Sequence, residues 1–272
     1  MTLIKEVNTK ILSENELSEM GKIQKDMWAY GLGEYVRCNC CNKIHSKNDI
    51  FGHLSYEIKR ESVTKLEEIF LGDSIRCKKC DSTNTDFIYD VSTNIEIFRD
   101  RYKQKSFLIL SYSQSGDIVG FCDGYIDSLE NIYKKDLKQH YPNLDLNLLS
   151  GKIQDKLLLD SIEDILFFSS LGTYEKNSSL KLAFDLFKNF LKTIKLSDEK
   201  IGFTELDRNN PLYFIYQVIG RLSLGISSDN VFNTSACYDS DLCVFPRESL
   251  DFFRNNGDYS LKDFLRLIKS KN

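Results

Sequence analysis

The chain has few prolines and no long apolar run. Three prolines occur in 272 residues, and no Gly/Ser-rich or low-complexity tract divides the chain into tethered parts. No run approaches the roughly eighteen apolar residues that a membrane-spanning helix needs. The N-terminal segment 1–10 lacks the apolar centre of a signal peptide. We therefore expect a cytoplasmic protein that does not enter membranes.

Basic residues are not in excess either. The formal net charge is −4, and segment 37–105 counts thirteen Lys and Arg against eleven Asp and Glu. Neutralising the phosphates of a nucleic acid needs clustered Lys and Arg, so nucleic acid is a disfavoured partner. Ordinary apolar content with eighteen Phe and fourteen Tyr predicts a folded chain with one sizeable core. Composition does not indicate the oligomeric state.

Cysteine is plentiful by contrast, and it is concentrated in one segment. Five of the eight cysteines lie between positions 38 and 80. In a chain without an export signal this favours metal or thiol chemistry over a disulfide framework. The segment holds two copies of R-C-x-x-C-[ND], at 37–42 and 76–81, separated by 35 residues between their C-x-x-C cores. When the two copies are aligned, Cys40 has no counterpart in the second copy. The other four cysteines form two C-x-x-C pairs, Cys38 with Cys41 and Cys77 with Cys80.

Two C-x-x-C turns predict a structural zinc site, because four thiolates can surround the ion as a tetrahedron. His45 and His53 are alternative ligands, although a loop histidine is more often simply exposed. Reduced, metal-free cysteines are the alternative to a zinc site. Cys122, Cys237 and Cys243 have the usual character of small apolar residues, and the sequence assigns them no further role.

A strand, a loop and a helix between 164 and 194 organise the rest of the chain. The nearly unbroken apolar run 165–171 predicts a strand that is covered on both faces. The loop 174–178 precedes the helix and can offer its free N–H groups to an anion. The helix is predicted from a single apolar stripe, formed by Leu180, Phe184, Phe187, Leu191 and Ile194.

Further elements complete a mixed α/β (α+β) chain. A capping box, Ser13 to Glu16, predicts a helix that runs to about Trp28. Further helices are expected at 212–219 and 260–270, and segment 127–161 is expected to be helical in places. Strands are expected at 2–7, 86–91, 107–112, 118–126, 201–206, 222–226 and 242–245.

This order resembles the GNAT-type N-acetyltransferase superfamily once the cysteine-rich segment is set apart. The clearest match is segment 204–220, where a strand leads to Asn209 and then to a helix with Y-x-x-x-G, formed by Tyr216 and Gly220. Gly120 in I-V-G-F also resembles a family strand. The resemblance implies a GNAT-like mixed central sheet flanked by helices. Residues 1–33 and 100–272 would form the acetyltransferase domain, and 34–99 an inserted zinc ribbon.

The family usually carries [RQ]-x-x-G-x-[GA] between the central strand and helix, where backbone amides close on the pyrophosphate of CoA. Here the aligned residues are K-N-S-S-L-K, at 176–181, so a positive charge is kept and both glycines are absent. Serine hydroxyls and N–H groups remain as donors. The resemblance implies acetyl-CoA as co-substrate, bound by Leu171, Thr173, Lys176, Asn177, Ser178, Ser179, Leu180 and Asn209.

The resemblance also implies direct attack of an amine on the thioester. Tyr216 would protonate the departing thiolate, and a backbone N–H near Leu171 would stabilise the oxyanion. Glu205 is the leading candidate for the base, acting through water. Asp164 and Glu163 are weaker candidates.

The acceptor is expected to be an amine of a small molecule or a protein. The inserted ribbon borders the acceptor side in the family arrangement, so we expect it to shape acceptor recognition. Segment 127–161 would cover the opposite edge of the cleft. Four polar residues of this segment are expected to form a solvent-exposed face, and they are Lys134, Lys135, Lys138 and His140.

Two other functions stay open. The chain could be a catalytically degenerate member of the fold that uses its zinc ribbon to bind a protein or nucleic acid, which the missing glycines favour. The retained Asn209, Tyr216 and Gly220 favour the enzyme. Acetylation of an aminoacyl-tRNA is a third idea, which the balanced charge of segment 37–105 makes weaker.

Overall fold

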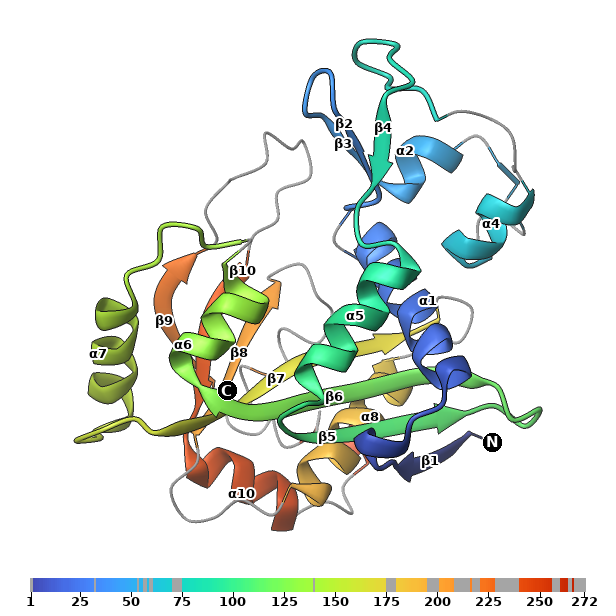
Figure 1. Ribbon diagram of the computed structural model, residues 1–272. Coiled ribbons are helices and arrows are strands. Elements are labelled where there is room, and N and C mark those ends of the chain that lie inside the picture. The colour runs from blue at the N-terminus through green and yellow to red at the C-terminus, as the bar shows by residue number, and fades with distance from the viewer. Residues whose placement is uncertain are drawn as a thin grey trace.

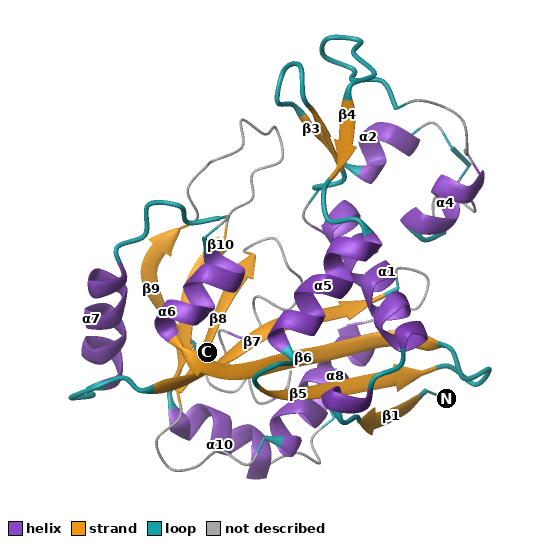
Figure 2. Ribbon diagram, in the orientation of Figure 1, coloured by secondary structure: helices purple, strands orange, loops and turns teal. Residues whose placement is uncertain are grey.

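A computed structural model gives the fold of most of the chain. The structure describes residues 2–31, 33–52, 54–55, 58, 61–69, 75–138, 140–174, 180–194, 201–207, 216, 221–227, 240–255, 260–263 and 266. Within them lie a seven-stranded sheet with helices on both faces and a separate three-stranded sheet (Figures 1 and 2). The prediction of a mixed α/β chain built on a central sheet flanked by helices is confirmed.

The large sheet mixes antiparallel and parallel pairs. All neighbouring strands are antiparallel except β7 and β8, which are parallel. Parallel neighbours need a crossover connection, and the helix α8 (Leu180–Thr193) provides it. In spatial order the strands are β1 (Leu3–Glu6), β5 (Lys105–Tyr112), β6 (Ile118–Ser128), β7 (Asp164–Thr173), β8 (Ile201–Asp207), β10 (Ser240–Phe245) and β9 (Leu222–Ser227).

Helices cover both faces of this sheet (Figure 1). One face carries two separate covers. The first cover consists of η1 (Thr9–Ile11), α1 (Glu14–Gly31) and α5 (Val91–Arg101), and the second of α6 (Leu129–Ile132), the π-helix η2 (Tyr133–Leu137) and α7 (Leu146–Leu157). The opposite face carries α8 and α10 (Arg247–Asn255).

Local sequence explains where the main helices begin and what they bury. The capping box of α1 is present, because Ser13 N donates to Glu16 Oε2 at 2.8 Å and Glu16 N donates to Ser13 Oγ at 3.2 Å. The predicted stripe of α8 is also confirmed, since Phe184, Phe187 and Leu191 are buried beneath the sheet.

The parallel pair opens at one end. Its ladder runs from Ile165 and Ile201 to Phe168 and Thr204, and among the described residues it ends there, although both strands continue. A bulge lies at the same point of β7, because Ser170 pairs with Asp123 whereas Phe168 pairs with Gly124. The extra residue is Ser169. A bulge increases the local twist and bends its strand, so the two strands part here.

Gly124 makes the close contact beside this bulge. A Cβ at Gly124 would lie 2.5 Å from Phe167 O and 2.8 Å from Phe190 Cζ. We therefore expect Gly124→Ala to lower the free energy of unfolding by about 1–3 kcal/mol. Gly151→Ala is the control, because Gly151 in α7 has nothing within 4 Å, and it should raise stability by about 0.5–1 kcal/mol. Chemical denaturation of both variants tests this, and equal stability of Gly124→Ala and wild type would refute it.

Some predictions were incomplete or incorrect. Segment 86–91 was expected to be a strand, but β4 (Thr85–Phe87) ends early, because the side chain of Asp90 accepts a hydrogen bond from Thr93 N at 2.7 Å and caps α5. The helix α5 was not predicted, and it packs against α1. The expected helix 212–219 lies outside the described residues except for Tyr216, as does most of 260–270.

Candidate active site and metal centre

The four cysteines of the sequence repeat converge on one point. The Sγ atoms of Cys38, Cys41, Cys77 and Cys80 all lie within 4.8 Å of one another. The shortest separations are 3.5 Å, between Cys38 and Cys80 and between Cys41 and Cys77. Cys40 is exposed and lies outside this group. The predicted grouping of the cysteines is confirmed.

The two turns repeat in backbone conformation as well as in sequence. Asn42 N donates to Cys38 O at 2.8 Å, and Asp81 N donates to Cys77 O at 2.8 Å. Asn42 and Asp81 both have positive φ, 55° and 58°. Asn and Asp tolerate this left-handed region better than other residues with a side chain. This explains why the last position of the repeat is Asn or Asp.

Four converging thiols are the donor set that Zn²⁺ prefers in closed structural sites. His45, the alternative ligand, is buried beside the group, with its Nε2 3.3 Å from Cys77 Sγ. Its ring contacts a sulfur of the group, in the manner of the outer contacts that orient metal ligands. His53 lies outside the described residues.

The cysteine turns belong to a small module that rests on the C-terminal half of α1 (Figure 1). Three buried charged residues fasten it there. Lys25 Nζ lies 2.5 Å from Glu67 Oε1, and Asp26 Oδ1 accepts from Val63 N at 2.9 Å and lies 3.9 Å from Lys47 Nζ. The module contains β2 (Val36–Cys38), β3 (Ile44–His45), β4, α2 (Lys47–Phe51) and α4 (Val63–Ile69).

A buried polar cluster lies at the point where β7 and β8 part. Glu205 is the first residue of β8 beyond the ladder, and its Oε2 lies 3.0 Å from His140 Nδ1. Ser240 Oγ donates to Glu205 Oε1 at 2.6 Å. His140 Nε2 lies 3.3 Å from the hydroxyl of Tyr89, and the ring of Tyr89 stacks on Trp28 at 4.6 Å. The cluster therefore joins β8, the segment after η2, the end of the cysteine module and α1.

The prediction of a solvated face is wrong for His140, which is 5% exposed. Its neighbours Leu137 and Tyr141 are buried in the core of the second helical cover. Because both are anchored there, the backbone between them places His140 on the buried side. Lys135 is also largely covered, and its Nζ lies 2.9 Å from Asp127 Oδ2. The apolar pair at 137 and 141, four residues apart, was the one local signal that this segment has a buried side.

The surrounding charges affect the proton affinity of this cluster. Burial on its own would lower the pKa of His140, but the carboxylates of Glu205, Glu34 and Asp136 outweigh burial and raise that pKa above its ordinary value. Burial, with Glu34 and Glu205, also raises the pKa of Tyr89 well above its usual range. Tyr89 is therefore a neutral phenol at physiological pH.

Tyr216 lies on the other face of the sheet. Its ring centroid is 5.0 Å from that of Phe187 and 5.8 Å from that of Phe245. Leu206 belongs to the same core cluster as Tyr216. Successive side chains of a strand point to opposite faces, so Glu205 faces away from Tyr216. Burial raises the pKa of Tyr216, and the phenol keeps its proton.

Part of the predicted CoA site can be placed. Leu171 and Thr173 lie on β7 beyond the end of the ladder, where they pair with Cys122 and Gly120 of β6. Leu180 is the first residue of α8. The remaining predicted residues, Lys176, Asn177, Ser178, Ser179 and Asn209, lie outside the described part of the chain.

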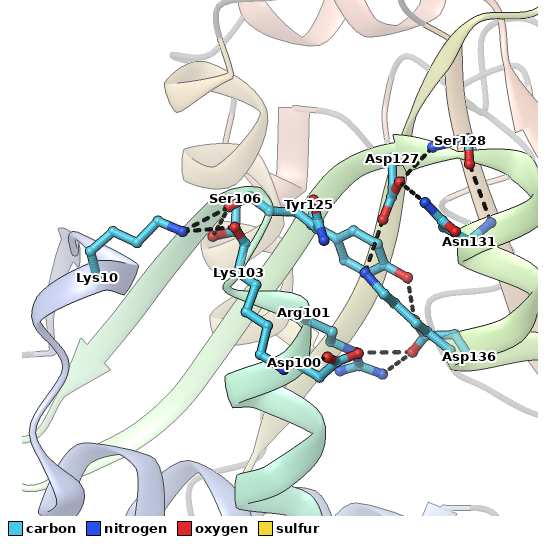
Figure 3. A network of polar contacts seen from close by, with 12 residues as sticks. Lys10, Asp100, Arg101, Lys103, Ser106, Tyr125, Asp127, Ser128, Asn131 and Asp136 are labelled. Atoms are coloured by element: carbon cyan, nitrogen blue, oxygen red, sulfur yellow. Dashed lines mark hydrogen bonds and ion pairs between the residues drawn. The ribbon is translucent and has the colours of Figure 1, made fainter.

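A second buried network was not predicted (Figure 3). Arg101, at the end of α5, donates from Nε to Asp136 Oδ1 at 2.9 Å and from Nη1 to Ser170 Oγ at 3.1 Å. The hydroxyl of Tyr125 donates to the other oxygen of Asp136. Asp123 Oδ2 lies 3.8 Å from Arg101 Nη1, and burial raises the pKa of Asp123 to about 6. The network ties the first helical cover to the second across β6 and β7.

A pocket of about 200 Å³ adjoins this network. Its lining mixes acidic and basic side chains with one aliphatic residue, and consists of Glu96, Ile97, Asp100, Arg101, Lys135 and Asp136. None of the described helices combines the length and the apolar character needed to cross a bilayer.

Comparison with known proteins gives a likeness to solved structures only. No family model and no curated protein matches the chain. A putative acetyltransferase from Acinetobacter baylyi is 11% identical, with 91% of this chain and 95% of that chain covered and a TM-score of 0.46. An N-acetyltransferase from Staphylococcus aureus is 10% identical, with 90% and 96% covered and a TM-score of 0.44.

Arabidopsis thaliana NAA60 in complex with a bisubstrate analogue is 15% identical, with 56% of this chain and 81% of that chain covered and a TM-score of 0.40. The solved structures with this likeness include N-acetyltransferases. All three TM-scores lie below 0.5.

Proposed function

We propose that the chain is an acetyl-CoA-dependent N-acetyltransferase that acetylates an amine of a small molecule or a protein by direct attack on the thioester. The observation that carries the proposal is the parting of β7 and β8 beyond Phe168 and Thr204, with a bulge at Ser169. A strand that leaves its partner offers backbone N–H and C=O groups to an extended ligand. Glu205 and its hydrogen-bond partner His140 lie beside this opening.

In this proposal the pantetheine arm binds along β7 between Ser169 and Thr173, with hydrogen bonds around Leu171 and Thr173. The pyrophosphate lies before α8, whose first turn offers N–H groups and the positive end of the helix dipole. Lys176, Asn177, Ser178, Ser179, Leu180 and Asn209 complete the site on the strength of the sequence.

The chemistry is divided between the two faces of the sheet. The amine approaches from the face of Glu205 and is deprotonated there. A backbone N–H near Leu171 stabilises the tetrahedral oxyanion, as preorganised donors do in acyl transfer. Tyr216, a neutral phenol held on the other face, protonates the leaving thiolate.

We further propose that the four cysteines hold a structural Zn²⁺ and that residues 34–99 form a module distinct from an acetyltransferase domain at 1–33 and 100–272. Within this module, Glu34 precedes β2 and Tyr89 follows β4, and both face His140. The module would thereby shape the acceptor side of the site. Replacing Cys77 and Cys80 by Ser should change acceptor preference, and unchanged preference in a folded variant would count against this role.

Isothermal titration with acetyl-CoA, and with CoA as a second ligand, tests the enzyme. We expect a dissociation constant on the order of micromolar. Ser178→Glu with Ser179→Glu should weaken binding at least about tenfold, because like charges would face the pyrophosphate. Ser115→Glu, at an exposed turn of the β5–β6 hairpin, is the matched control.

The absence of binding at millimolar ligand would refute the proposal, and partners of the cysteine module would then be sought instead. If acetyl-CoA binds, release of the CoA thiol is followed with spermidine and with a short peptide that has a free N-terminus. These two probes separate a small-molecule acceptor from a protein acceptor.

A further inference from the structure

The strongest feature that the sequence did not reveal is the chain of contacts from Glu205 through His140 to Tyr89. It brings together residues from three segments that are distant along the chain, and His140 is 5% exposed. The donor and acceptor roles of these groups fix the direction of the hydrogen bonds. A carboxylate only accepts hydrogen bonds, and Glu205 already accepts from Ser240 at its other oxygen.

The proton of a neutral His140 must therefore sit on Nδ1, where it is donated to Glu205. Nε2 is then an acceptor, and the hydroxyl of Tyr89 donates to it. The phenolic oxygen of Tyr89 can then still accept a hydrogen bond or a proton from another group through its lone pairs.

The backbone of Tyr89 supports a functional role. Its φ is 55°, in the left-handed region that a bulky aromatic residue rarely adopts. This conformation is held by the buried Asn94, whose Nδ2 donates to Tyr89 O at 3.2 Å and to Gly21 O at 3.0 Å. Strain that is held by its surroundings is found at functional sites. Here it aims the phenol at His140, while Trp28 covers the other side of its ring.

Resting on the proposed acetyltransferase activity, we propose that His140 is the proton acceptor of the reaction, that Tyr89 relays the proton to it, and that Glu205 is a positioning residue. As the amine nitrogen forms its bond to the thioester carbonyl carbon, the π electrons of the carbonyl move onto its oxygen, the amine proton passes to Tyr89 O, and the phenolic proton passes to His140 Nε2. The oxyanion then re-forms the C=O bond as the C–S bond breaks, and the thiolate takes a proton from Tyr216. Exchange with solvent removes the proton from the imidazolium and returns one to Tyr216.

This arrangement gives a defined pH dependence. The groups that face His140 are Glu205 from β8, Asp136 from η2, Glu34 before β2 and Tyr89 before α5. The three carboxylates raise the pKa of His140. His140 must be neutral to accept a proton, so the reaction rate should fall as the pH drops through the raised pKa of His140. Glu205→Gln removes one of the three negative charges and should move the acidic limb of the rate profile to lower pH.

NMR titration of the His140 ring in the substrate-free protein is the first test, because it does not depend on activity. Spectra are assigned by comparison with His140→Gln. We expect the pKa of His140 to fall by at least about one unit in Glu205→Gln and to change little in Tyr89→Phe. An unchanged pKa in Glu205→Gln would overturn the positioning role.

Kinetics with the amine probe that the enzyme accepts provide the second test. His140→Gln should lower kcat by about 10²- to 10⁴-fold, and Tyr89→Phe should lower kcat with little change in KM. Tyr133→Phe is the matched control, because its hydroxyl donates to Pro142 O at the surface and it should keep wild-type rates. A wild-type acidic limb in Glu205→Gln, or full activity in Tyr89→Phe, would overturn the relay.

Acetyl-CoA binding, measured in each variant, separates the two proposals. Variants that bind acetyl-CoA normally but lose turnover support the relay. A wild-type protein that does not bind acetyl-CoA refutes the proposed function, whereas the NMR titration still decides whether Glu205 controls His140.

Discussion

The purified protein is expected to carry one zinc ion per chain, and replacing Cys77 and Cys80 together by Ser should remove it. Zinc binding contributes about 10–16 kcal/mol to the folding of small four-ligand domains. The module has a small core, with Tyr35, Phe51, Val63 and Leu66 among its buried residues. We expect the part of it that precedes α5, residues 34–89, to unfold without the ion, because α5 packs against α1. Elemental analysis measures the metal, and hydrogen exchange measures protection in β2, β3 and β4.

Cys40→Ser is the matched control, because Cys40 is adjacent in sequence but exposed and outside the four-sulfur group. This variant should keep its zinc and its exchange protection. Zinc-free protein that nevertheless shows full protection in the module would contradict the prediction. Equal loss of zinc in Cys40→Ser would show that the wrong cysteines had been grouped.

Arg101→Leu is expected to lower the free energy of unfolding by about 3–5 kcal/mol, since breaking a buried ion pair leaves its partner charged and unpaired. Arg101 is 8% exposed and ion-pairs with Asp136 and Asp123, and it also donates to Ser170. Loss of the guanidinium would leave two carboxylates close together at the junction of the helical covers. Chemical denaturation at neutral pH measures the effect.

Arg99→Leu is the control on the same helix. Arg99 pairs with Glu14 at the surface, where its side chain is 50% exposed, and exposed pairs contribute roughly 0.2–1 kcal/mol. If Arg101→Leu lowers the free energy of unfolding no more than Arg99→Leu does, the buried network does not stabilise the fold as proposed.

The sequence predicted the elements whose signals are local. The capping box at Ser13 and the apolar stripe of α8 fixed two helices, and the repeat around the cysteines fixed the four-sulfur group, because each needs only residues a few positions apart. The helix α5 was not predicted. Its cap, Asp90, closes a segment that was expected to be a strand. Two of its buried residues, Asn94 and Arg101, are polar, and Phe98 is the buried apolar residue between them, so the apolar pattern of the helix is weak.

The candidate site was predicted only in part, for a physical reason. Glu205 and Tyr216 could be selected by their positions relative to Asn209 and Gly220. His140 has its partner Glu205 65 residues away, and Arg101 has its partner Ser170 69 residues away. Leu137 and Tyr141 indicate locally that the segment around His140 has a buried side, but a polar residue has the same local pattern whether it faces solvent or a distant buried partner, so the sequence alone did not identify those partners.

The helix α1 is shared by two folding units, and this has a consequence for the order of assembly. Its N-terminal half packs Leu17, Met20 and Ile23 against strands that begin about a hundred residues later. Its C-terminal half holds α4, which is close in sequence. Contacts between nearby residues form faster than distant ones. We therefore expect the cysteine-rich segment to fold early on the end of α1 and to present a preformed helix to β5 and β6.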